Sequence, residues 1–217
     1  MDGIGPEPQR QLSTIGDVAV EERLFQARVA ELRDAGLPIK LHLGPGPVPR
    51  EGFLNIEKYV HHGPVDGFFE RFPRDFINFP FAERAWPIPD ACVDYIFHED
   101  FIEHITQRQQ ILVLAEALRV MRPGTIHRIN TPDLIASMRR SDFSRGFAGV
   151  FVEEWDRWGH LALFTRPSLE DVARMVGYRQ VYFTAKDKGL SPYAIPDHRP
   201  GDDRNPIDGN IFADLLK

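Results

Sequence analysis

The sequence feature that most constrains this chain is an apolar segment that runs into a glycine bend. Residues 41–43 (Leu-His-Leu) lead into Gly-Pro-Gly-Pro at 44–47, and a second apolar segment, 53–56, ends in Glu57. We interpret this pattern as a strand, a tight turn and a second strand that ends in a carboxylate. Glycine has no Cβ atom, so the backbone can bend sharply there and approach a ligand closely. An acidic residue in this place binds ribose hydroxyls in dinucleotide sites, so the pattern favours a nucleoside-containing cofactor. The alternative is an ordinary Gly-Pro-Gly turn.

Length and composition predict one soluble domain. The 217 residues, with 42% hydrophobic and 27% charged side chains, suffice for one sizeable core, and no internal boundary divides 1–217. A net charge of -6 disfavours nucleic acid or an anionic membrane as the main partner. With one cysteine, Cys92, an intrachain disulfide is excluded. No apolar run approaches the ~20 residues of a membrane helix, and the N-terminus lacks a signal-peptide pattern, so we expect a cytoplasmic protein.

Strand-like segments alternate with segments of helical periodicity, which favours an α/β fold with a mostly parallel sheet. Strands are expected at 39–43, 53–57, 76–79, 93–97, 126–129, 181–184 and 210–216, and helices at 17–35, 107–121, 134–140 and 165–176. The 107–121 helix, which Thr106 can cap, is predicted to face the sheet with an apolar stripe: Ile111, Leu114, Ala115, Leu118 and Met121. Residues 1–16 are expected to be loose. The irregular segment 141–164 is interpreted as an insertion that covers a pocket.

Several short motifs occur in an order that resembles the class I S-adenosylmethionine-dependent methyltransferases, specifically their small type 11 group. They are residues 40–46, 52–57, 86–94, 99–104, 116–124, 131–133 and 168–178, so the resemblance spans roughly residue 39 to the C-terminus. It implies a Rossmann-like, seven-stranded, mostly parallel sheet with an antiparallel last strand and helices on both faces. It also implies S-adenosylmethionine as the cofactor, lying over the carboxyl ends of the strands.

The resemblance assigns cofactor-binding roles by position. Residues 43–46 would contact the methionine part, Glu57 and the adjacent Lys58 would lie at the ribose, and residues 81–83 would border the adenine. His98 and Glu99 would line the methionine side. The full set is Leu43, Gly44, Pro45, Gly46, Glu57, Lys58, Phe81, Ala82, Glu83, His98 and Glu99.

This chain departs from the family pattern at two places. Pro45 and Pro47 remove backbone N–H donors from the bend. Phe81 stands where the family usually has an acid that accepts a hydrogen bond from adenine, which a phenyl ring cannot do.

Three residues are candidates for acid–base chemistry: His104, His160 and Asp133. Each has a structural alternative. His104 can brace the turn in which it lies, His160 can anchor the insertion, and Asp133 can cap the helix that follows it.

Asp100, Glu103 and His104 have the spacing of one helical face, and two carboxylates with an imidazole can bind a divalent metal. A solvated or capping role is favoured for these residues, and no metal site is predicted.

The sequence thus predicts transfer of a methyl group from S-adenosylmethionine to an oxygen or nitrogen of a small molecule. The alternative is a methyltransferase-like domain that no longer methylates and serves as a binding module or catalyses another reaction in the same pocket. The oligomeric state is left open, with a homodimer as one option.

Overall fold

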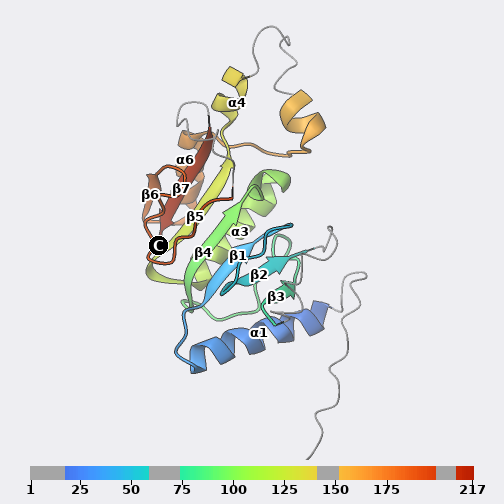
Figure 1. Cartoon of the computed structure of the whole chain (residues 1–217), viewed down its shortest axis with the longest axis vertical. Coiled ribbons are helices and arrows are strands. Elements are labelled where there is room, and N and C mark those ends of the chain that lie inside the picture. The colour runs from blue at the N-terminus through green and yellow to red at the C-terminus, as the bar shows by residue number, and fades with distance from the viewer. Residues whose placement is uncertain (1–17, 59–73, 141–151, 199–208) are drawn as a thin grey trace, which may run out of the picture.

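In the computed structural model, the described residues are 18–58, 74–140, 152–198 and 209–217 (Figure 1). The expectations for residues 1–16 and for the first part of the 141–164 insertion therefore lie outside the described residues.

The seven strands form one sheet in the order β3-β2-β1-β4-β5-β7-β6. Their bounds are β1 Lys40–Leu43, β2 Leu54–Glu57, β3 Phe76–Asn78, β4 Val93–Glu99, β5 Met121–Pro132, β6 Gln180–Phe183 and β7 Asn210–Leu216. Strands β1 to β5 pair in parallel, whereas β7 is antiparallel to both β5 and β6. The predicted seven-stranded, mostly parallel sheet with an antiparallel last strand is confirmed. Because β1, β2 and β4 are parallel, their carboxyl ends meet at one edge of the sheet.

The alternating strand residues separate two hydrophobic clusters. The larger cluster contains inward residues of the strands, such as Leu41, Ile56 and Ile96, together with buried residues of three helices. These are α1 Val18–Asp34, α3 Gln107–Val120 and α6 Arg166–Val176. The opposite face of the sheet carries a smaller cluster built around Tyr95 and Phe97. In Figure 1, α1 lies across the β3 end of the sheet and α4 Leu134–Arg140 lies at the other end of the molecule.

Helix boundaries follow the capping signals in the sequence. Thr106 and Thr165 each accept a hydrogen bond from the backbone three residues later, which completes a capping box at the start of α3 and of α6. Gly177, with a φ of 120°, ends α6.

The apolar stripe predicted for α3 is wrong in part. Ile111 is 51% exposed, whereas the polar Gln110 is buried because its amide donates to the backbone oxygens of Ile102 and Ala162. The buried face consists of Gln110, Val113, Leu114, Ala117 and Val120. Met121 is buried too, but as the first residue of β5.

A buried arginine fixes the face of the sheet that carries the smaller cluster. Arg128 on β5 has no exposed side-chain surface and forms ion pairs with Asp197 at 2.8 Å and Asp214 at 3.1 Å. It also donates to the Thr184 hydroxyl and to the Ala185 carbonyl. The segment 184–197 is thereby held against β5 and β7.

Among the helices that the structure describes, none is long and apolar enough to cross a membrane.

Candidate functional site

The glycine bend and the acid at the end of β2 lie next to each other. Gly44 and Gly46 have φ values of 58° and 50°, in the region that side chains with a Cβ atom disfavour. The N–H of Gly44 donates to the Ile56 carbonyl, which ties the bend to β2. The N–H of Gly46 donates to the Glu57 carboxylate at 3.4 Å. The structure therefore brings together the two features from which the sequence interpretation began.

The ring of Phe101 lies against Gly44. A Cβ atom at position 44 would be 2.5 Å from Cδ2 of Phe101, closer than any contact between real side chains. The same ring packs on Phe81, with 4.9 Å between ring centroids. Only glycine fits at position 44, and Phe101 limits the space on this side of the bend. Pro45 is buried within the bend and Leu43 is buried at the end of β1.

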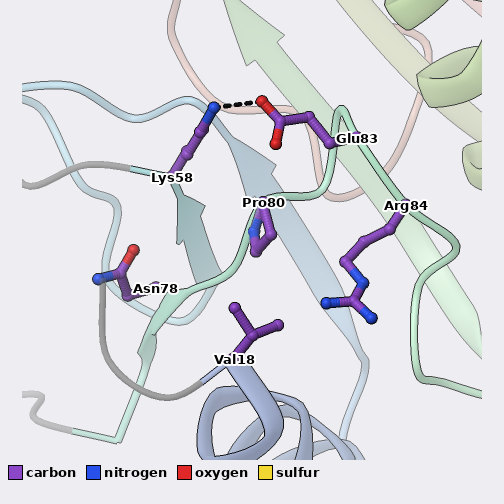
Figure 2. Close-up of a pocket in the computed structure, with 6 residues that line it drawn as sticks. All are labelled: Val18, Lys58, Asn78, Pro80, Glu83 and Arg84. Carbon is purple, nitrogen blue, oxygen red and sulfur yellow. Dashed lines mark hydrogen bonds and ion pairs between the residues drawn. The ribbon is translucent and has the colours of Figure 1, made fainter.

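A cavity of about 470 Å³ opens at the ends of β2 and β3. Figure 2 shows its lining residues: Val18, Lys58, Asn78, Pro80, Glu83 and Arg84. Lys58 and Glu83, two predicted cofactor residues, form an ion pair across its rim. The cavity thus lies beside the end of β2, where Glu57 is, and carries acids and bases that can bond a polar ligand.

Phe81 and Ala82 belong to the core. Phe81 is 1% exposed and Ala82 is 7% exposed. The indole N–H of Trp86 donates to the Phe81 carbonyl at 2.9 Å. This bond fixes the turn that carries Glu83 into the cavity wall.

His98 is a buried histidine without a hydrogen bond to either ring nitrogen in the described part of the chain. Its ring packs edge-on against Phe101 and His127. Burial, followed by the neighbouring His127 and His42, holds the pKa of His98 well below its ordinary value. His98 is therefore neutral and lies directly behind Phe101.

Glu99 and Asp133 make contacts of a structural kind. The Glu99 carboxylate accepts hydrogen bonds from the Asn130 amide at 2.5 Å and from the backbone N–H of His198 at 2.8 Å. Asp133 accepts from the N–H of Ile135, so its carboxylate caps α4, the alternative that the sequence left open.

The single helical face that the spacing of Asp100, Glu103 and His104 allows is not formed. The solvated role favoured from the sequence is also wrong for Glu103, which is fully buried. Only the short 3₁₀ turn η1, Ile102–His104, follows β4. Asp100 precedes that turn with a φ of 49° and lies near the amide of Asn210, at 3.5 Å. A left-handed residue before a three-residue turn breaks the helical spacing that a shared face requires.

A different cluster forms instead, because the segment 154–162 docks on η1. The N–H groups of Leu161 and Ala162 both donate to the Glu103 carbonyl. Ligand atoms of Glu103, His104 and His160 then all lie within 4.8 Å of one another. The ring centroids of His104 and His160 are 4.7 Å apart. We call these three residues the Glu-His-His cluster.

Further contacts orient each side chain of the Glu-His-His cluster. The Nδ1 of His160 bonds the Glu154 carboxylate at 2.9 Å. The Thr131 hydroxyl, near the end of β5, donates to Glu103 at 3.0 Å. Burial and the neighbouring His160 lower the pKa of His104, and a hydrogen bond with the Gly159 backbone opposes them. His160 and Glu103 are buried, whereas His104 is exposed, so the cluster is open on one side.

Sequence reasoning did not find Glu154, Thr131 or Gln110 as parts of this site. Glu154 and His160 are six residues apart and connected through the single π-helical turn η3, Val152–Arg157, a spacing that no common motif uses. Thr131 offered a usable signal, because it lies just before Asp133 near the end of a predicted strand.

Comparisons with known proteins agree with this fold. No family model matches the chain. A probable S-adenosylmethionine-dependent methyltransferase of Mycolicibacterium smegmatis is 38% identical over 66 residues, which is 30% of this chain and 24% of that protein. The match therefore spans about a quarter of the curated relative.

Solved structures resemble most of the chain. A methyltransferase of Archaeoglobus fulgidus has a TM-score of 0.54 and 14% identity, and the match covers 92% of this chain and 98% of that one. A phosphoethanolamine N-methyltransferase of Haemonchus contortus, solved with phosphomonomethylethanolamine and S-adenosylhomocysteine, has a TM-score of 0.50 and 13% identity over 78% of this chain and 43% of its own. The chain thus has the fold of S-adenosylmethionine-dependent methyltransferases.

Proposed function

We propose that this chain binds S-adenosylmethionine and transfers its methyl group to an oxygen or nitrogen of a small molecule, as a member of the type 11 group. One observation carries the proposal: in a sheet of methyltransferase order, the Glu57 carboxylate faces the Gly44–Gly46 bend, with Gly46 N–H 3.4 Å away. Open α/β sheets bind ligands at the carboxyl ends of their strands, which is where both groups lie.

The residues around the bend fit such a cofactor. We assign the ribose to Glu57, whose two oxygens can accept both hydroxyl hydrogens. We assign the adenine to the cavity beside Glu57, where Glu83 and Asn78 offer oxygen acceptors that Phe81 lacks. The methionine part then extends past Gly44 towards Phe101 and His98. In this assignment, Glu83 and Asn78 supply the hydrogen-bond acceptor that the family usually has as an acid at the position of Phe81.

When bound, the cofactor supplies an electrophilic methyl group on a sulfonium. The protein has to align an acceptor with that methyl group and, for a hydroxyl or an ammonium, to accept a proton. We place the acceptor at the Glu-His-His cluster, because Glu103 and His104 lie two and three residues after Phe101 and the cluster is open on the side of His104. When no ion is bound there, its two imidazoles are candidates for the group that accepts the proton.

Titration of the purified chain with S-adenosylhomocysteine in a calorimeter tests the proposal. We expect micromolar binding, and about tenfold weaker binding in Glu57→Gln, since an amide nitrogen cannot accept the ribose hydrogen bond. Glu51→Gln, an exposed change on the loop before β2, is the matched control and should bind as the native chain does. Absence of heat up to millimolar ligand, or equal affinity in all three proteins, would contradict the assignment.

Phe101 favours a second candidate, a methyltransferase-like module that binds ligands without transferring methyl groups. Its ring lies over Gly44, on the side where the methionine part has to pass. Mixing the chain with isotopically labelled S-adenosylmethionine and a small-molecule extract distinguishes the two candidates. Label incorporated into a small molecule supports the transferase, and cofactor binding without any incorporation supports the module.

A further inference from the structure

We propose that the Glu-His-His cluster binds one divalent first-row transition metal ion. The proposal concerns metal binding alone and does not depend on methyl transfer. It rests on the convergence of Glu103, His104 and His160, whose ligand atoms all lie within 4.8 Å of one another although the residues come from two separate segments.

The donor set identifies the class of ion. Two imidazoles and one carboxylate suit zinc, iron, cobalt or nickel, whereas magnesium and calcium prefer oxygen ligands alone. Two histidines and a glutamate are also a set that holds catalytic zinc with a coordination position left for water or substrate. The open side of the cluster, at the exposed His104, provides room for such a fourth ligand.

The surroundings orient the ligands as metal sites require. A histidine ligand donates its other ring N–H to a carboxylate or a backbone carbonyl, which fixes the nitrogen that faces the ion. Nδ1 of His160 bonds Glu154 at 2.9 Å, which leaves Nε2 for the ion. Glu103 accepts from Thr131 through one oxygen. Two of the three ligands are therefore already held by a second group, and the third, His104, is exposed and can turn towards them.

The geometry needs only a small adjustment. Ligand atoms ~2.0–2.2 Å from one ion lie ~3–3.5 Å apart, so the widest separation in the cluster, at most 4.8 Å, must contract by no more than about 1.3–1.8 Å. His104 can supply this movement by rotation of an exposed side chain. The buried Glu103 and His160 are held by the backbone bonds from Leu161 and Ala162 to the Glu103 carbonyl, and provide the fixed part of the site.

The test is metal titration of the tag-free, full-length chain after chelator treatment and dialysis. Calorimetry with ZnCl₂ is expected to give one site per chain, and CoCl₂ is expected to give the visible absorption of a low-coordinate cobalt site. MgCl₂ is expected to bind at least about tenfold more weakly than zinc.

Variants assign the site to these residues. Glu154→Gln removes the charge behind His160 and should weaken zinc binding by about 10–100-fold. His104→Ala, an exposed change that leaves the buried contacts in place, should weaken zinc binding at least as much. His198→Ala, at an exposed histidine outside the cluster, is the control and should bind as the native chain does. Circular dichroism confirms that each variant is folded.

Two results would overturn the proposal. One is the absence of zinc and cobalt binding up to high micromolar concentrations, which would make the cluster a hydrogen-bonded anchor of segment 154–162. The other is binding that survives in folded His104→Ala and Glu154→Gln, which would place the ion elsewhere on the surface.

Discussion

The backbone N–H of Gly46 points at the Glu57 carboxylate, 3.4 Å away, across the carboxyl ends of two parallel strands. Both partners are held from other sides, because Gly44 bonds the Ile56 carbonyl and Glu57 accepts the N–H of Lys58 at 2.8 Å. A ligand that enters here meets an acceptor and a donor already in place, so little ordering remains to be done on binding.

The two glycines of the bend should differ in their tolerance of alanine. Gly46→Ala meets no atom within 4 Å and should lose only ~1–2 kcal/mol of unfolding free energy to its left-handed backbone. Gly44→Ala has the same strain and also places a methyl group 2.5 Å from Phe101, so its loss should be clearly larger. Urea denaturation measures both. The double variant Gly44→Ala/Phe101→Ala should show a coupling free energy, and strict additivity would mean that the ring moves away without cost.

Truncation of Phe101 should increase access to the bend. Phe101→Ala removes the ring that lies between Gly44, Phe81 and His98, at a stability cost of about 3 kcal/mol for a half-buried phenylalanine. If the ring restricts the methionine side, the affinity for S-adenosylhomocysteine should rise in this variant. If the ring instead packs on the ligand, the affinity should fall. Calorimetry decides between the two and should be paired with Ile111→Ala, an exposed change on α3 that leaves the affinity unchanged.

Loss of the buried arginine should destabilise the chain strongly. Arg128→Met leaves Asp197 and Asp214 buried without their cation, which should lower the free energy of unfolding by ~3–5 kcal/mol. Arg122→Met breaks a partly exposed pair with Asp94 and should cost ~0–1 kcal/mol. Denaturant midpoints compare the two. Similar midpoints would show that water stabilises the two carboxylates once Arg128 has been replaced.

Buried histidines should make the chain sensitive to mild acid. Burial lowers the pKa of His42 and of His127 to about 3, and lowers that of His98 well below normal. The unfolded chain takes up these protons near pH ~6.5, whereas the folded chain does not. Stability from these groups is therefore complete above pH ~6.5 and is lost as the pH falls towards 3, by up to ~1.4 kcal/mol per pH unit for each histidine.

A single substitution tests this pH dependence. His98→Phe removes one of these titrations without removing a hydrogen bond that the structure describes, so the slope of unfolding free energy between pH 6 and 5 should decrease by up to ~1.4 kcal/mol per unit. Ile111→Ala, an exposed change at a residue that does not titrate, should leave the slope unchanged. Equal slopes in all three proteins would mean that His98 titrates normally.

The sheet could be predicted from the sequence because the local residue pattern indicates each strand. Segments such as 93–97 are rich in β-branched and aromatic residues, and caps such as Thr106 and Gly177 mark where helices begin and end. Local rules failed where a distant group decides the outcome. Gln110 is buried because Ile102 and Ala162 offer it carbonyl oxygens, and Ile111 is exposed in consequence.

The Gly44–Gly46 bend and the Glu-His-His cluster likewise differ in how far the sequence predicts them. Gly46 lies just after β1 and Glu57 is the last residue of β2, and these two strands pair in parallel, so their proximity follows from the fold alone. The meeting of His104 with His160 depends on two backbone bonds between segments far apart in sequence. Sequence periodicity does not indicate contacts between distant segments. For this reason the sequence suggested Asp100, and not His160, as the third residue beside Glu103 and His104.

Strand β7 lies between β5 and β6, although it follows both of them in the chain. Before residues 210–216 have been synthesised, β5 can pair only with β4, and β6 has no neighbour in the sheet that the structure describes. On the ribosome, β1 to β5 can therefore assemble early, while β6 must await translation of β7. A nascent chain released before residue 210 should expose one edge of β5 and an unpaired β6 to chaperones and proteases.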